Sequence, residues 1–184
     1  VYIYSKNDPQ ILNHLADLMD IVVVGMDWNY RYLPVPYNNG GGMACFLKGS
    51  PVEMGDGKEK AIDAVKKGDL VSIGGEETDE VVEVIEKIDH VWLSFIIGDK
   101  EIKTVPDQVF YADEKGREIQ KSAITLMAGD LIKNNKGETS VVTYKSDLKT
   151  ENVPTWDLVL KKSEFYFVGG YKVQSVLKNN EELL

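Results

Sequence analysis

The residue with the clearest capacity for chemistry is the single cysteine of the chain, Cys45. It follows closely on a run of three glycines, 40–42, and precedes the apolar pair Phe46-Leu47. A cysteine thiolate is a strong nucleophile, and a glycine-rich backbone allows close approach of other groups. One interpretation is that Cys45 attacks the carbonyl of its own upstream peptide bond, Ala44–Cys45. The alternative is a small buried apolar side chain, as most lone cysteines are.

The segment before this cysteine differs from the rest of the chain. Residues 1–43 form an N-terminal α/β flanking segment, with a predicted helix at about 8–20, a strand at 21–24 and a flexible glycine-rich joint. Asp8-Pro9 suits the start of that helix, with Asp as the N-cap and Pro in the first turn. An apolar helix and strand need a surface to cover, so we expect this segment to dock on the main domain or on a partner.

After Cys45 the sequence is typical of short strands separated by turns. Gly55-Asp56-Gly57 is a hairpin signal, and residues 61–65 predict a single helical turn. Residues 80–88 and 91–97 read as two strands, with His90 between them in a turn or at a strand edge. Many short strands with turn residues at intervals of about 8–12 positions predict an all-β architecture.

An internal repeat supports this prediction. Gly68-Asp69-Leu70-Val71 recurs 61 residues later as Gly129-Asp130-Leu131-Ile132, each preceded by a turn and an apolar bridging segment. Two such units predict a pseudo-two-fold β-fold in which each half covers the apolar face of the other. The segments that lead into the two halves, at Cys45 and near Val105, would then meet near the pseudo-axis.

The bulk composition excludes several classes of function. The chain has 184 residues, of which 43% are hydrophobic and 28% charged, as in ordinary soluble globular proteins. The net charge of −9 argues against binding of nucleic-acid backbones. Apolar runs are shorter than a membrane span, no cleavable signal is visible, and no residues have metal-ligand or phosphate-loop spacing, so no cofactor is expected. The chain starts at Val1 without Met, which suggests a fragment, a processed product or a trimmed chain.

Several motifs occur in a recognisable order. The opening block is Cys45-Phe46-Leu47-Lys48-Gly49-Ser50-Pro51-Val52, followed by Asp56-Gly57 and the first Gly-Asp turn. Residues 105–110, 156–158 and 166–175 form the later blocks. Together these blocks resemble the Hint family, the hedgehog and intein self-processing domains, whose patterns are C-F-x-x-G-T-x-V, D-G and T-P-D-H-P-F. They span residues 45–175, about 70% of the chain, and suit a minimal domain without an endonuclease insert.

The resemblance implies a horseshoe-shaped all-β domain at residues 44–176, flanked by residues 1–43 and a C-terminal tail at 177–184. It also implies a self-directed reaction, in which the Cys45 thiol attacks the Ala44 carbonyl and exchanges the amide for a thioester by an N–S acyl shift. The implied partners are the chain's own flanking segments. Such a reaction is a single-turnover cleavage and not turnover of a separate substrate.

The chain departs from the family pattern at the residues that assist this reaction. Val105 and Gln108 stand where the family has Thr and His, although Thr104 lies one position earlier. Gln cannot shuttle a proton near pH 7, and a positioned acid or base contributes about 10²–10⁴ in rate. Gln174-Ser175 stands where the family has His-Asn, so release of the downstream segment lacks its nucleophile unless Gln174 cyclises slowly ahead of Ser175.

Asp157 is a further candidate, because an acid near this place in the family tunes the cysteine and relays protons. Asp-Leu on a strand is equally typical of a turn edge. Two functions therefore stay open. The first is an attenuated self-processing module that cleaves at Ala44–Cys45. The second is a Hint-like scaffold without chemistry, serving as a structural or interaction module in a larger phage or bacterial assembly.

Overall fold

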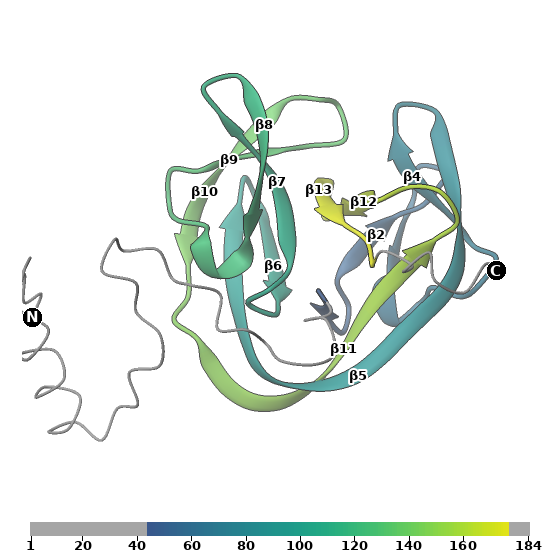
Figure 1. Cartoon of the computed structure of the whole chain (residues 1–184), viewed down its shortest axis with the longest axis horizontal. Coiled ribbons are helices and arrows are strands. Elements are labelled where there is room, and N and C mark those ends of the chain that lie inside the picture. Colours follow the sequence, from purple (N-terminus) through teal and green to yellow (C-terminus); the bar gives the residue numbers. More distant parts are fainter. Residues whose placement is uncertain (1–43, 177–184) are drawn as a thin grey trace, which may run out of the picture. The chain divides into compact units, whose positions relative to one another are not determined.

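The computed structural model describes residues 44–176, and these are almost entirely β-structure (Figure 1). The strands are β1 (Phe46–Leu47), β2 (Pro51–Glu53), β3 (Glu59–Ala61), β4 (Leu70–Gly74), β5 (Glu77–Ile97), β6 (Lys100–Thr104), β7 (Val109–Glu114), β8 (Arg117–Ser122), β9 (Leu131–Lys133), β10 (Thr139–Lys145), β11 (Lys149–Leu160), β12 (Phe165–Val168) and β13 (Tyr171–Gln174). Two 3₁₀ turns complete them, η1 (Ile62–Ala64) and η2 (Ala123–Thr125). The predicted helix at 8–20, the strand at 21–24 and the tail at 177–184 lie outside the described residues, so the domain boundaries stay predictions.

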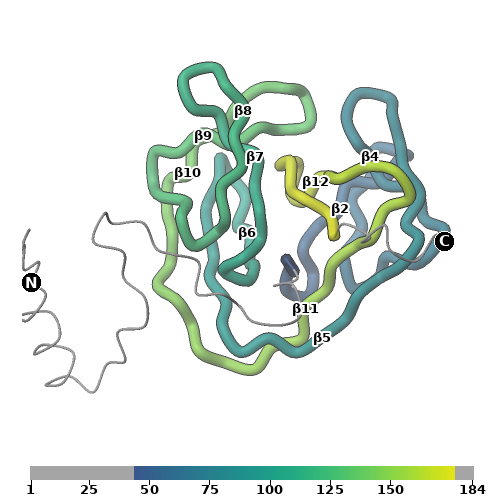
Figure 2. Tube along the Cα trace, viewed as in Figure 1, coloured from purple at the N-terminus to yellow at the C-terminus, as the bar shows by residue number. Residues whose placement is uncertain are grey.

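Two long strands, β5 and β11, form the base of the domain. They pair antiparallel from Trp92–Lys149 at one end to Val81–Leu160 at the other. Figure 2 shows them curving side by side, with β7 to β10 gathered over one end and β4 and β12 over the other. The prediction of a horseshoe-shaped all-β fold is therefore confirmed. Within this domain, no helix is long and apolar enough to span a membrane.

The internal repeat is confirmed at the level of single contacts. In each unit, the aspartate of the Gly-Asp turn forms an ion pair with the lysine nine residues earlier. The Nζ–Oδ distance is 2.6 Å for Lys60–Asp69 and 2.9 Å for Lys121–Asp130. The same carboxylate accepts the backbone N–H of the residue three positions before it. Because the 3₁₀ turns η1 and η2 also stand 61 residues apart, the two halves share one local architecture.

Strand β1 is two residues long but lies at the centre of the fold. Phe46 pairs with Trp156 of β11 on one side and with Thr104 of β6 on the other. Its fully buried ring meets Phe110 and Tyr166 edge-on, with centroids 6.3 and 6.4 Å apart. Burial of a phenylalanine contributes about 1.5–3 kcal/mol, and each aromatic pair about 0.5–1.5 kcal/mol more. The residue that precedes Phe46 is therefore held by contacts from several strands.

One prediction about the strands was wrong. The strands predicted at 80–88 and 91–97 are a single strand, β5, and His90 lies inside it instead of in a turn. The exposed His90 ring contacts Asn152 across the pair with β11, at 2.5 Å between Nδ1 and Oδ1. Adjacent residues of a strand point to opposite faces, so His90 lies on the solvent face and Asp89, which is half-buried, points the other way. Because no glycine or proline interrupts this stretch, nothing ends the pairing.

Candidate functional site

The carbonyl of Cys45 is held at the place where β6 ends and the sequence block of residues 105–110 begins. Thr104 Oγ1 donates a hydrogen bond to the Cys45 oxygen at 2.7 Å, and the Val105 N–H donates to the same oxygen at 3.1 Å. Val105 in turn accepts a hydrogen bond from the Gln108 N–H at 3.3 Å. The cysteine and the turn that carries Gln108 are thus joined directly. The Thr104 hydroxyl lies on the carbonyl of Cys45, one residue past the carbonyl of Ala44 that the proposed attack would use.

The Cys45 thiol is fully buried, but polar groups surround it. One step beyond the Phe46–Trp156 pair, the register of β1 and β11 sets Cys45 opposite Asp157. Burial raises the pKa of the Cys45 thiol to about 12, and the charge of Asp157 adds to this effect. Lys87 and a hydrogen bond with Thr155 act in the opposite direction. The resting site therefore holds a thiol and not a thiolate.

Asp157 is a fully buried carboxyl in the interior of β11, so the turn-edge interpretation was wrong. Its Oδ1 accepts the Tyr166 hydroxyl at 2.8 Å and the Leu158 N–H at 2.6 Å. Its Oδ2 has no hydrogen-bond partner among residues 44–176. Burial raises the pKa of Asp157 to about 8, although the two hydrogen bonds act in the opposite direction. At neutral pH the carboxyl is therefore mostly protonated. The proton is on Oδ2, because Oδ1 already accepts two hydrogen bonds.

A chain of contacts leads from the thiol toward the surface. Thr155 is fully buried, and its hydroxyl lowers the pKa of the Cys45 thiol. The same hydroxyl donates to Asp89 Oδ2 at 2.6 Å. Asp89 forms an ion pair with Lys87 at 3.3 Å, and its side chain is 23% exposed. The buried thiol is thus connected through one hydroxyl to a carboxylate that reaches solvent.

A second group of predicted residues lies together near the end of the domain. Gln108 is fully buried, and its Nε2 donates to the backbone oxygen of Gln174 at 3.2 Å. Its Oε1 finds no partner in the described part of the chain. The Ser175 hydroxyl donates to the Ser163 oxygen at 3.1 Å, away from this contact. The structure therefore brings Gln108 to the Gln174–Ser175 bond and places the Ser175 hydroxyl elsewhere.

Four residues around the thiol were missed by the sequence analysis: Thr155, Lys87, Asp89 and Tyr166. A signal existed for the first three. Thr155 and Asp157 are two positions apart in a strand, as are Lys87 and Asp89, so each pair shares one face. Thr155 pairs with Lys87 across the two strands. Tyr166 gave no such signal. It stands in a run of aromatic residues, and the sequence alone does not show that its hydroxyl bonds a buried carboxyl.

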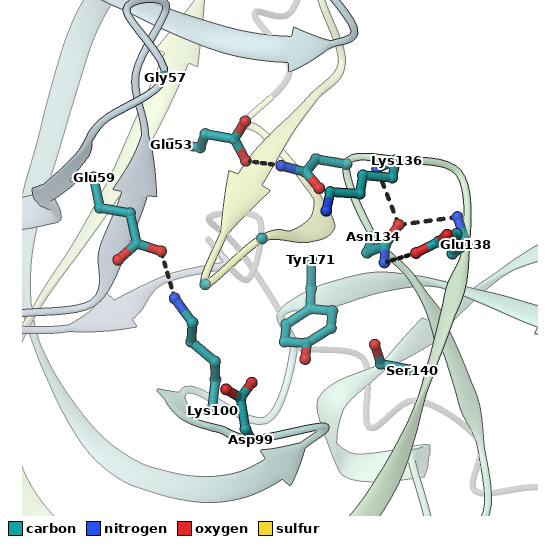
Figure 3. Close-up of a pocket in the computed structure, with 13 residues that line it drawn as sticks. Glu53, Gly57, Glu59, Asp99, Lys100, Asn134, Lys136, Glu138, Ser140 and Tyr171 are labelled. Carbon is teal, nitrogen blue, oxygen red and sulfur yellow. Dashed lines mark hydrogen bonds and ion pairs between the residues drawn. The ribbon is translucent and has the colours of Figure 1, made fainter.

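A polar cavity of about 560 Å³ lies apart from these residues (Figure 3). It opens between the Glu53–Glu59 hairpin and the turn of residues 134–138, next to Tyr171. None of the candidate residues lines it. Two of its carboxylates already have partners, because Glu59 binds Lys100 and Glu53 binds Asn135. This cavity is therefore not the site of the thiol chemistry.

Solved structures of inteins share this fold. A bacterial intein-like domain from Clostridium thermocellum superposes with a TM-score of 0.64 and 25% identity, over 73% of this chain and 99% of that chain. The gp41-1 intein gives a TM-score of 0.59 and 15% identity over 72% and 98% of the two chains. The DnaB intein from Synechocystis sp. PCC 6803 gives 0.54 and 15% over 73% and 99%. No family model and no curated protein sequence matches the chain. The described residues therefore define an intein-like, or Hint-like, domain by fold.

Proposed function

We propose that the domain cleaves its own chain at Ala44–Cys45 through a thioester, and that this activity is attenuated. The observation that carries the proposal is the burial of the Cys45 thiol near Asp157, whose Oδ2 has no hydrogen-bond partner in residues 44–176. A nucleophile next to a protonated acid meets the two needs of an acyl shift from nitrogen to sulfur. The intein-like fold supports the same reaction class.

The acyl shift moves one proton at each end of the breaking bond. The Cys45 Sγ–H bond breaks while Sγ forms a bond to the Ala44 carbonyl carbon. The C–N bond to the Cys45 nitrogen then breaks, and that nitrogen takes a proton from Asp157 Oδ2 to become a free amine. The proton that left the thiol replaces it on Asp157, so the carboxyl ends as it began and the net change is one proton moved from sulfur to nitrogen. The amide has become a thioester without any other reactant. Water or an added thiol then attacks the thioester, releases a fragment that ends at Ala44 and restores the thiol.

Asp157 acts as the acid of this step because of its protonation state. With a pKa of about 8, roughly nine in ten of these carboxyls are protonated at pH 7. Burial raises the pKa of the Cys45 thiol to about 12, so the thiol is protonated at that pH. The acid is therefore ready at neutral pH, whereas the nucleophile needs help to lose its proton. Gln108 cannot supply that help by titrating, which accounts for the attenuation.

Release at the far end of the domain is much slower in this proposal. The Gln108 amide polarises the Gln174 carbonyl through its hydrogen bond, as a donor in an oxyanion hole does. However, the Gln108, Gln174 and Ser175 side chains include no group that titrates near pH 7. Cyclisation of Gln174 therefore lacks a proton donor for the departing Ser175 nitrogen. The expected product is an N-terminal cleavage and not a spliced chain.

The test is an intact-mass measurement of the full chain incubated with dithiothreitol at pH 7.5. The proposal predicts a time-dependent fragment that ends at Ala44, together with its complement that begins at Cys45. The variant Cys45→Ala removes the sulfur at a buried site and is the matched control, in which no fragment is expected. A chain that stays intact, or a fragment that also forms in Cys45→Ala, would overturn the proposal.

A non-catalytic scaffold is the second candidate, and one observation favours it. The thiol and its neighbouring acid are both buried and both protonated at neutral pH, which is also what a stable inert core would hold. In that case the domain would serve as a structural or interaction module of a larger assembly. An intact chain after prolonged incubation with the thiol, at every pH from 6 to 9.5, is the result that this second candidate predicts.

A further inference from the structure

We propose that Tyr166 positions the acid of the cleavage reaction: its hydroxyl holds Asp157 Oδ1 and thereby keeps the carboxyl proton on Oδ2. The inference rests on the proposed function, because it assigns a part in that reaction to a residue that acts through Asp157. Tyr166 stands in the last sequence block, residues 166–175, which also carries the second predicted bond at Gln174. A side chain of that block therefore serves the bond at the other end of the domain.

The Tyr166 side chain is fixed by its surroundings. It is fully buried, and its ring meets the Phe46 ring edge-on with centroids 6.4 Å apart. Its backbone pairs with Val173, in the antiparallel pair of β12 with β13. Because a tyrosine side chain has only two torsions, a fixed ring also fixes its hydroxyl oxygen. Phe46 follows Cys45 directly, so the ring packs against the strand next to the thiol while the hydroxyl reaches the Asp157 carboxyl.

The hydrogen bonds on Asp157 decide which of its oxygens carries the proton. Oδ1 accepts the Tyr166 hydroxyl at 2.8 Å and the Leu158 N–H at 2.6 Å. The N–H can only donate, and the hydroxyl uses its one proton in this bond. A proton on Oδ1 would therefore face two donors, whereas Oδ2 has no hydrogen-bond partner in residues 44–176. Oδ2 is also the oxygen that the proposed reaction needs in its protonated form.

Removal of the hydroxyl leaves the Leu158 N–H to orient the carboxyl. The last torsion of an aspartate side chain is broad, so the carboxyl then turns more freely. In part of the molecules its proton would point away from the Cys45 nitrogen, and the cleavage rate would fall. The same removal takes a donor away from the ionised carboxyl, so the pKa of Asp157 should rise. The two consequences are separable, because one lowers the rate and the other moves its pH dependence.

The Tyr166 hydroxyl stays a donor throughout the pH range of the reaction. Burial raises the pKa of Tyr166 well above its usual value, and the charge of Asp157 acts in the same direction. Burial likewise keeps the Cys45 thiol protonated, with a pKa of about 12. The remaining charged groups near the thiol and the acid are Lys87 and Asp89 of β5, which form an ion pair at 3.3 Å. Loss of the hydroxyl therefore acts on Asp157 while these groups keep their charges.

The experiment is the pH profile of cleavage for the full chain and for Tyr166→Phe, which keeps the ring. Dithiothreitol is used at concentrations where the rate no longer depends on it, so that the acyl shift is measured. This step neither takes up nor releases a proton overall, so the wild-type rate should be independent of pH below about 8 and should fall above it, where Asp157 ionises. Tyr166→Phe should cleave about tenfold more slowly at pH 7, and its rate should begin to fall about one pH unit higher.

Tyr171→Phe is the matched control for loss of a buried hydroxyl. Tyr171 is also a buried tyrosine, and its hydroxyl donates to the Ile97 backbone oxygen at 2.6 Å. Loss of either hydroxyl should lower stability in urea unfolding, but Tyr171→Phe should leave the pH at which the rate falls unchanged. A Tyr166→Phe chain with the wild-type pH dependence, whether slower or not, would overturn the positioning role while the proposed cleavage stands.

A second measurement covers the case in which the wild type does not cleave, which would overturn the proposed function. In Cys45→Ala, which has no thiol, the protonated Asp157 carboxyl is followed by its infrared C=O absorption, assigned by its absence when Asp157→Asn is added. The hydrogen bond from Tyr166 predicts a titration midpoint near pH 8 and a higher midpoint when Tyr166→Phe is added. Equal midpoints would overturn the inference whatever the result of the cleavage assay.

Discussion

The two ends of this domain, at the Ala44–Cys45 and Gln174–Ser175 bonds, lie in different chemical surroundings. At the first, the Cys45 carbonyl, one residue past the Ala44 carbonyl, accepts hydrogen bonds from Thr104 and Val105, with Asp157 nearby. At the second, the Gln174 carbonyl accepts a hydrogen bond from Gln108. The first contains a thiol and a carboxyl, which can exchange protons. The second contains amides and a hydroxyl, which stay neutral across the physiological range.

This difference shows that a fold can keep the hydrogen bonds to a carbonyl while it lacks the proton donor that the reaction needs. Hydrogen bonds alone polarise a carbonyl, but breaking an amide also needs a proton delivered to the leaving nitrogen. Only the first end has such a proton, on Asp157. Changes at Asp157 should therefore affect cleavage far more than changes at Ser175.

The largest effect is expected from Asp157→Asn. The amide keeps the hydrogen bonds to Tyr166 and Leu158 through its oxygen but has no acidic proton to give. The cleavage rate at pH 7 should fall about 10²–10⁴-fold, measured as appearance of the fragment that ends at Ala44. A rate within about threefold of wild type would show that Asp157 does not supply the proton, and the two ends would then not differ in this respect.

The same substitution should alter the pH dependence of stability. The folded pKa of Asp157, about 8, lies above its ordinary value of 3.8, so the folded chain binds more protons than the unfolded chain between pH 4 and 8. Its contribution to stability is complete below about pH 4 and is lost as pH rises through 8, by on the order of 2–4 kcal/mol between pH 5 and 8. Urea unfolding in a Cys45→Ala background should show this loss, and Asp157→Asn should abolish it.

A matched carboxyl provides the control for that experiment. The hydrogen bond from Lys60 lowers the pKa of Asp69, so Asp69 is ionised in both folded and unfolded chains between pH 5 and 8. Asp69→Asn should change stability equally at both pH values. An equal pH response of wild type and Asp157→Asn would mean that Asp157 is ionised in the folded protein.

A smaller effect is expected from Gln108→His, which adds a titrating group to the second end. The turn that carries residue 108 is bonded through Val105 to the Cys45 carbonyl. We expect the cleavage rate to rise about tenfold, less than for a fully positioned acid or base. Gln108→Leu, without a titrating group, should give no increase. If the histidine variant does not respond either, the turn does not reach the reacting bond.

The smallest effect is expected from Ser175→Ala. The hydroxyl donates to the Ser163 oxygen, so its loss should cost about 0.5–1.5 kcal/mol of stability in urea unfolding. Cleavage at Ala44–Cys45 should stay within about twofold of wild type. A tenfold loss of cleavage would show that the two ends are coupled.

The fold was predictable because its signals are local or repeated. The Gly-Asp turns at 68–69 and 129–130 mark equivalent positions in the two halves, and the glycines at both turns have positive φ. The length of β5 was not predictable. The polar pair Asp89-His90 looks like a turn in isolation, and only pairing with β11 shows that the strand continues.

The site was predictable only in part, for a related reason. Cys45, Gln108 and Asp157 stand in sequence blocks, and their types suggest chemistry by themselves. Thr155 and Asp89, which stand outside these motifs, are brought near the thiol only through the register that joins β1, β5 and β11. The raised pKa of Asp157 likewise comes from its burial, which no spacing in the sequence specifies.

The most direct test of the central claim is chemical capture of the thioester between Ala44 and Cys45. Full-length chain treated with hydroxylamine at pH 7.5 should yield a fragment of residues 1–44 whose C-terminal Ala44 carries a hydroxamate, identified by mass. Cys45→Ala should yield none. A wild-type chain that gives no hydroxamate, or a Cys45→Ala chain that gives the same amount, would contradict the account.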